Sequence, residues 1–167
     1  SSVRLLEFAA IPAPALDAGG QPPDHAVFVT FDETIALDGV TLPDSDSFAP
    51  GDPLPITLHW SADETPTYDA IVALFLVTAD GRVVAQGQDS PPVGGFAPTS
   101  TWELDTPILD NRALGVPPDL PAGEYQLWVR LYHWTPDGQQ IILAVDGGEI
   151  AGDDADIAVL PVSITIE

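Results

Sequence analysis

One stretch of the chain, residues 124–134, combines side-chain types that could do chemistry. Its odd positions from Tyr125 to Leu131 form a plausible core face, and its even positions form a row of aromatic and hydrogen-bonding side chains: Gln126, Trp128, Arg130, Tyr132 and Trp134. Because successive side chains of a β-strand point to opposite faces, this row would lie opposite the core. Aromatic rings stack on the apolar faces of sugars, while Arg and Gln bond to hydroxyl groups. The row is therefore our candidate glycan-binding surface.

The same row also has a structural interpretation, in which it binds no glycan. A loop, the N-terminal segment or another domain would cover the aromatic rings, or the strand would present this row to the core. The exposure of Trp128 in the folded chain distinguishes the two interpretations.

Two acidic loops contain residues that could bind a cation. The first contains Asp44, Asp46 and Asp52, and the second contains Asp146, Glu149, Asp153, Asp154 and Asp156. Ca²⁺ takes about six to eight oxygen ligands, which carboxylates supply. Neither loop has the ligand spacing of an EF-hand, and solvated acidic loops are common. We therefore expect no cofactor, and the second loop is the better of two weak calcium candidates.

Catalytic patterns are absent from the sequence. His25, His59 and His133 lack metal-ligand spacing, and there is no Cys to act as nucleophile, disulfide partner or metal ligand. Gly-x-Ser-x-Gly, P-loop and dinucleotide-binding motifs are also missing. A carboxylate pair for glycoside hydrolysis carries no weight, because among 26 acidic residues some pair always fits. We expect no enzymatic activity in this chain.

The charge balance limits the partners. The 167-residue chain has 26 acidic residues, four arginines and no lysine, which gives a formal net charge of -22. Nucleic acids and anionic membranes attract Lys and Arg, so both would repel this chain. No apolar run approaches the roughly 20 residues that span a bilayer, so we expect no direct membrane insertion. The expected partner is a glycan or another domain of the parent protein.

Short strands must position these residues. Eighteen prolines and 14 glycines interrupt the chain and leave no long helical period. Short apolar runs lie between them, and several of these alternate with polar residues, which is typical of a β-sandwich. About nine strands are expected, at residues 26–31, 34–42, 54–60, 68–78, 83–88, 106–114, 124–134, 140–145 and 157–166.

Several residues indicate which strands are covered. Residues 68–78 are apolar at both odd and even positions, which predicts a central strand buried on both faces. Trp60 lies on the same face of its strand as Leu54, Ile56 and Leu58, so we expect it in the core. Trp102 is expected to anchor the long loop at residues 89–100.

Turn motifs predict how the strands pair. Asp80-Gly81 and Asp137-Gly138 tolerate the positive φ angles of tight hairpins. Consecutive hairpins imply an all-β fold of two antiparallel sheets, with immunoglobulin-like or jelly-roll connections. We expect residues 25–167 to form a single β-sandwich domain. Residues 1–24 are expected to be a linker or N-terminal extension that could add one edge strand, at Leu5–Phe8.

Five motifs together resemble a known module. They are Ile35-x-Leu37-x-Gly39-Val40-x-Leu42, Pro50-Gly51-Asp52-x-Leu54-x-Ile56-x-Leu58-x-Trp60, Asp80-Gly81-Arg82-Val83-Val84-Ala85-Gln86, Pro98-Thr99-Ser100-Thr101-Trp102 and Leu120-Pro121-Ala122-Gly123-Glu124-Tyr125-x-Leu127. The chain is similar, over residues 26–166, to β-sandwich modules that follow the membrane-spanning part of predicted mannosyltransferase-like glycosyltransferases of environmental bacteria. The resemblance implies an extracytoplasmic domain of a membrane-anchored parent whose chemistry lies elsewhere. It supplies no binding residues.

The sequence thus leads to one hypothesis and one alternative. The hypothesis is a non-catalytic accessory domain of a membrane glycosyltransferase-like protein that binds glycan through the aromatic row. The alternative is a structural spacer or protein-docking sandwich with no small ligand. Because the chain starts at Ser1 and not at Met, we expect it to be a piece of a longer protein.

Overall fold

The computed structural model describes residues 23–43 and 47–167. These residues form thirteen strands and two short 3₁₀-helices, η2 (Pro92–Gly95) and η3 (Thr99–Thr101), with no α-helix among them. No helix in this part of the chain is long and apolar enough to cross a membrane. The all-β fold predicted from the sequence is confirmed, whereas the edge strand predicted at Leu5–Phe8 lies outside the described residues.

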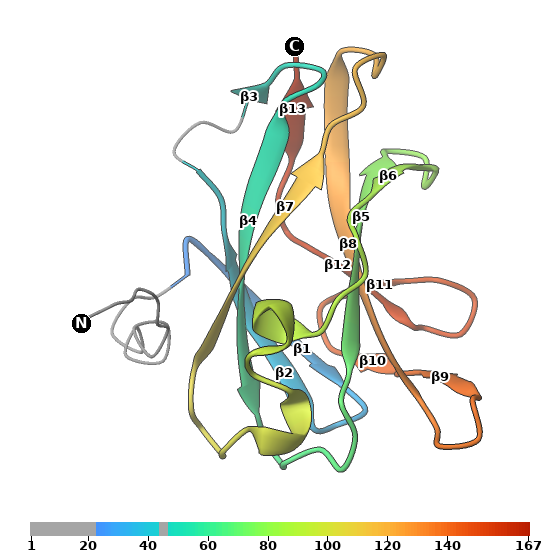
Figure 1. Ribbon diagram of the computed structural model, residues 1–167. Coiled ribbons are helices and arrows are strands. Elements are labelled where there is room, and N and C mark those ends of the chain that lie inside the picture. The colour runs from blue at the N-terminus through green and yellow to red at the C-terminus, as the bar shows by residue number, and fades with distance from the viewer. Residues whose placement is uncertain (1–22, 44–46) are drawn as a thin grey trace.

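Two sheets pack face to face (Figure 1). The first sheet has the order β10-β1-β2-β4-β7, and its strands are Val145–Asp146, His25–Phe31, Ile35–Thr41, Pro53–Ala62 and Ile108–Gly115. The second sheet is built around the long strand β8 (Gly123–Trp134). On one edge of β8 lie β5 (Ile71–Thr78) and then β6 (Val83–Gln86). On its other edge lie β9 (Gln140–Ile142), β12 (Ile157–Val159) and β13 (Ile164–Ile166), flanked by β11 (Glu149–Ala151) and β3 (Ser47–Phe48).

The strand order is of the immunoglobulin type. In that fold strands A, B and E share one sheet and strands C, F and G share the other. Here β2, β4 and β7 form the first set and β5, β8 and β13 the second, with β6 beside β5. The hydroxyl of Tyr125, near the start of β8, donates a hydrogen bond of 2.7 Å to the carbonyl oxygen of Pro121. This contact is the tyrosine corner of immunoglobulin-type folds, and it favours immunoglobulin-like over jelly-roll connections.

The core lies between the two sheets. Leu54, Ile56, Leu58 and Trp60 of β4 are each at most 1% exposed. The second sheet contributes Tyr125, Leu127, Val129 and Leu131 of β8 to the same core. Strand β5 is buried on both faces, as predicted. Trp102 is 3% exposed and its ring lies 6.4 Å from that of Trp60, so the expectations for both tryptophans are confirmed.

The structure divides two of the predicted strands and adds two short ones. Residues 140–145 become β9, which pairs with β8, and β10, which pairs with β1 in the opposite sheet. Residues 157–166 become β12 and β13, which both pair with β8 and are separated by a segment containing Pro161, a residue without an N–H for the ladder. Strands β3 and β11 have two and three residues, which is too few for a periodic pattern.

Candidate functional site

Strand β8 presents the predicted row on the outer face of the second sheet. The odd residues Tyr125, Leu127, Val129 and Leu131 are buried in the core. The row therefore faces away from the core, because side chains alternate along the strand. Its five members nevertheless differ in what surrounds them.

The middle of the row contacts a small apolar cluster on the same face. Tyr132 and Trp128 pack with Ala73, Phe75 and Val77, which are outward residues of β5. Tyr132 is 8% exposed, and its hydroxyl donates to Asp89 over 2.7 Å. The half-buried Trp128 donates its indole N–H to Gln126 over 3.2 Å. These side chains are thus held by one another and by β5.

Arg130 is also engaged within the domain. Its guanidinium carbon lies 5.9 Å from the centre of the Phe75 ring, in a cation–π arrangement. One terminal nitrogen lies 3.5 Å from Asp156, so the positive charge is paired. Arg130 Nε and Asp156 Oδ1 are buried without hydrogen-bond partners, which costs free energy and offsets part of the gain from the ion pair.

The five residues of the second acidic loop do not converge. Asp146, Glu149, Asp153 and Asp154 are exposed, and Asp156 faces Arg130 instead. Within residues 23–43 and 47–167, no three His, Asp or Glu side chains are arranged to hold a metal ion. Of the first loop, Asp44 and Asp46 lie outside the described residues, and Asp52 accepts a hydrogen bond from the backbone N–H of Ala49.

Trp134 is the exposed member of the row. Its side chain is 54% exposed, and its ring meets Tyr132 edge to face with centroids 6.1 Å apart. An open depression of about 460 Å³ lies beside it, a volume within the usual range for ligand sites. The lining residues are Thr67, Tyr68, Asp69, His133, Trp134, Thr135 and Pro136. The structure thus joins the end of β8 to the loop between β4 and β5.

Both walls of this depression are anchored. The rings of Tyr68 and His133 stack with centroids 4.1 Å apart, and the hydroxyl of Tyr68 donates to Asp32 over 2.7 Å. Burial raises the pKa of Tyr68 to about 12; the hydrogen bond with Thr34 opposes the rise, and Asp32 adds to it. The carboxylate of Asp69 accepts hydrogen bonds from the backbone N–H and the hydroxyl of Ser100. The depression is therefore preformed.

The depression lies among the connections at one end of the sandwich. Its residues come from the connection between β4 and β5 and from the turn that follows β8. These correspond to the B–C and F–G connections, which form part of the binding surface of immunoglobulin variable domains. Loops at the end of a rigid sandwich are a common place for binding residues.

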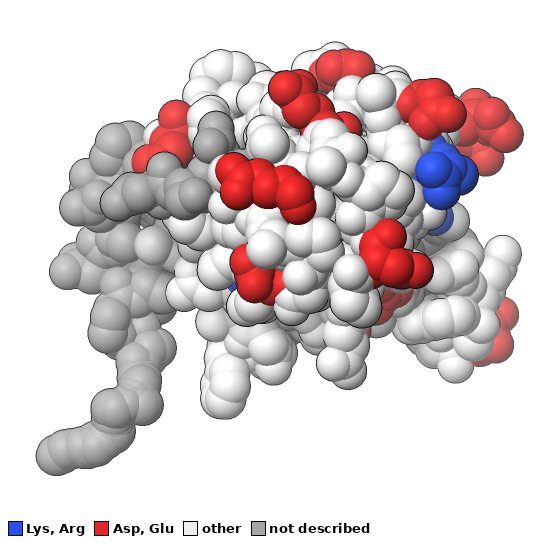
Figure 2. Space-filling view, turned by 90° about the horizontal axis from the view of Figure 1, so that it is seen from above, with Lys and Arg blue, Asp and Glu red and all other residues white. Residues whose placement is uncertain are grey.

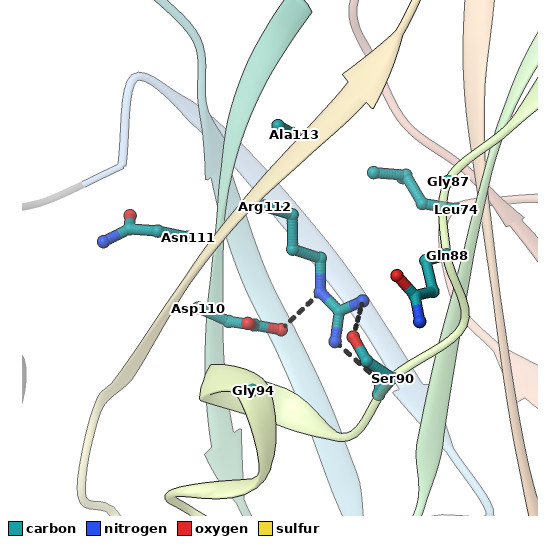
Figure 3. A pocket seen from close by; sticks show the side chains of 9 residues that line it. All are labelled: Leu74, Gly87, Gln88, Ser90, Gly94, Asp110, Asn111, Arg112 and Ala113. Carbon is teal, nitrogen blue, oxygen red and sulfur yellow. Dashed lines mark hydrogen bonds and ion pairs between the residues drawn. The ribbon is translucent and has the colours of Figure 1, made fainter.

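A second hollow lies between β7 and the segment 87–94 (Figure 3). Its volume is about 190 Å³, below the roughly 300 Å³ of typical ligand pockets. The guanidinium of Arg112 reaches across it and makes five hydrogen bonds, to Asp110, to the hydroxyl and carbonyl of Ser90, and to the carbonyls of Val72 and Pro91. All five N–H donors of the guanidinium are used in this way. The hollow therefore contains a structural network that links β7 to the segment 87–94.

Asp110 and Arg112 were not predicted from the sequence as structural residues. Both occupy inward positions of β7, in the series Ile108, Asp110, Arg112, Leu114. Burial of an unpaired charge is costly, so two charges at core positions indicate a paired network. In the predicted strand 106–114, Asp110 and Arg112 alternate with outward residues and share a face with Ile108 and Leu114, which indicated this paired network.

Comparison with known proteins supports no family assignment. No protein-family model and no curated protein matches the chain. Among solved structures, the chain is similar to the C-terminal domain of wzt, with a TM-score of 0.48, 11% identity and coverage of 87% of this chain and 93% of that one. It is also similar to a CARDB domain from Pyrococcus furiosus solved with di-metal ions, with a TM-score of 0.38, 8% identity and coverage of 86% and 92%. Strand order and core packing define the chain as a β-sandwich domain of the immunoglobulin type.

Proposed function

We propose that this domain is a non-catalytic glycan-binding module and that Trp134 is its principal contact residue. The observation that carries the proposal is the exposed indole of Trp134 beside a preformed depression lined by Asp69 and two threonines. A sugar ring presents apolar C–H groups on one face and hydroxyl groups around its edge. The indole would take the apolar face and the polar residues the edge.

The geometry suits a fixed stacking surface. Tyr132 supports the Trp134 ring from one side and is itself held by Asp89. Asp69 is oriented by Ser100. Because these groups are positioned before any ligand arrives, binding would cost little additional conformational entropy. Trp128, Arg130 and Gln126 lie further along the same face and could contact a longer glycan.

The wider setting of the proposal follows from the motif resemblance. The similar modules follow the membrane-spanning part of predicted glycosyltransferases. We accordingly propose that this domain serves as an accessory part of such a protein, outside the cytoplasmic membrane, and presents or retains the glycan. The catalytic step would belong to another part of the parent.

Binding of the 167-residue chain to a broad glycan array tests the proposal, beside Trp134→Ala, Trp128→Ala and Phe28→Ala variants. Phe28 is 80% exposed on β1 of the opposite sheet, so it is a matched control for loss of an exposed aromatic ring. We expect Trp134→Ala to weaken binding by at least about tenfold, as for a central contact residue, and Phe28→Ala to leave it unchanged. A smaller loss of glycan affinity in Trp128→Ala would show that the site extends along the sheet. A folded protein that binds no glycan would contradict the proposal and favour the docking alternative.

A further inference from the structure

We infer, on the basis of the proposed function, that the depression beside Trp134 selects uncharged glycans and rejects those that carry carboxylate, sulfate or phosphate groups. The inference rests on the placement of charge around the site, which is independent of the stacking argument. It names the class of ligand that the site would take.

One carboxylate lines the depression, and two others belong to residues next to its lining. Asp69 lines it, and Asp137 follows directly after the lining residues Thr135 and Pro136. Asp32 lies behind Tyr68, bonded to its hydroxyl. An anionic group on a ligand would meet like charges here, whereas a sugar hydroxyl would donate to the carboxylate of Asp69. A carboxylate has about four acceptor positions, more than the two used by Ser100.

No arginine of the described residues compensates these charges. The side chain of Arg112 is 8% exposed, and its N–H donors are used in hydrogen bonds beside β7. Arg130 is paired with Asp156. Arg82 lies in the turn after β5, and the eight residues of β5 separate that turn from the site by about 23 Å. This separation exceeds the Debye length of about 8 Å at physiological salt, so Arg82 would attract no anion to the site.

The rest of the molecule adds to the repulsion. The chain has a formal net charge of -22 and no lysine. Figure 2 views the sandwich from the end that carries the C-terminus, opposite the depression, and acidic residues are spread over that face as well. A protein field of one sign lowers the local concentration of ligands of the same sign. An anionic glycan would therefore be disfavoured both at the contact and during approach.

The test compares three forms of the same short oligosaccharides of glucose, mannose, galactose and N-acetylglucosamine. The first form is neutral, the second has its C6 hydroxyls oxidised to carboxylates, and the third is the methyl ester of the second. Affinities would be measured by calorimetry at about 0.01 M and about 1 M salt, because screening is weak in the first and strong in the second. The methyl ester separates the effect of charge from that of the altered C6 group.

We expect the neutral form to bind at least about tenfold more tightly than the oxidised form at low salt, with much of the difference lost at high salt. The methyl ester is expected to regain binding. A double variant, Asp69→Asn with Asp137→Asn, is expected to reduce the difference in affinity between the neutral and the oxidised oligosaccharides. Equal or tighter binding of the oxidised form at low salt would overturn the inference and leave the proposed function intact. Binding of none of the forms by the folded chain would overturn both.

Discussion

The indole N–H of Trp60 is donated to a carboxylate oxygen of Asp110 over 3.1 Å, and each of these residues is 1% exposed. The contact crosses the pairing of β4 with β7. Asp110 also accepts from the Nε–H of Arg112 and from the backbone N–H of Val93, each over 2.8 Å. The network thereby joins the core to the segment containing η2, which lies along the outer edge of β7. Coverage of this kind protects an edge strand from pairing with other chains.

Removal of Asp110 is expected to be strongly destabilising. Asp110→Ala leaves the guanidinium of Arg112 buried without its counter-charge, and breaking one partner of a buried ion pair costs about 3–5 kcal/mol. The measurement is the free energy of unfolding from denaturant titration. Asp119→Ala, at an exposed turn position, is the control and should change that value by no more than about 0.5 kcal/mol. A loss below about 1 kcal/mol in Asp110→Ala would show that the network does not stabilise the edge.

Tyr132 is expected to act on glycan binding through Trp134. Tyr132→Phe removes the hydrogen bond to Asp89 and keeps the ring, so we expect a loss of about 1 kcal/mol in stability. The affinity for the glycan should fall less than in Trp134→Ala, because the stacking surface remains. Asp89→Asn should change affinity in the same direction. Unchanged affinity in both variants would show that the contact does not position Trp134.

The alkaline titration of the tyrosines is a third expectation. Burial raises the pKa of Tyr132 to about 12, with further contributions from the hydrogen bond to Asp89 and from its charge. The folded-state pKa lies above the unfolded value, so this contribution to stability is fully present below about pH 10 and is lost as the pH rises towards 12. Absorbance of ionised phenol against pH measures the shift. Asp89→Asn should lower the pKa of Tyr132, and no change in that variant would contradict the assignment.

Acidification is expected to destabilise the fold through His59. Burial lowers the pKa of this imidazole, while the charges of Asp24 and Asp38 oppose the change. A lowered folded-state pKa means that the unfolded chain binds the proton more readily, so stability falls as the pH drops through about 6.5. Unfolding free energies of the wild type and of His59→Gln should be compared between about pH 7.5 and 5.5. The variant should show a shallower fall, and an equal slope would exclude His59 as the cause.

Local patterns were sufficient for the larger elements. The alternation of Leu54, Ile56, Leu58 and Trp60 predicted both a strand and its buried face, because side chains of a strand alternate between two faces. The Asp80-Gly81 turn predicted its hairpin, and Gly81 has the positive φ of 92° that such turns require. Nothing comparable marks β3, whose two residues depend on a parallel pairing with β13.

The candidate site was only partly predictable. Trp134 belonged to the predicted row, but the sequence did not distinguish it from Trp128, which packs against outward residues of β5. The partners of Trp134 in the depression, Tyr68 and Asp69, come from a loop far away in the sequence. Their approach depends on the pairing of β5 with β8 along eight residues, and such long-range pairing is not encoded in local periodicity.

By itself the sequence determined the fold class, the buried face of β4, the burial of β5 on both faces and the acidity of the chain, because these depend on residue type and on periodicity within a few positions. The tertiary structure decided which aromatic residue stays exposed, how Asp110 and Arg112 are neutralised, and which end of the sandwich carries the depression. These properties depend on neighbours that only strand pairing and loop packing bring together. Exposure and charge compensation are set by the surroundings of a side chain, and a single strand does not contain those surroundings.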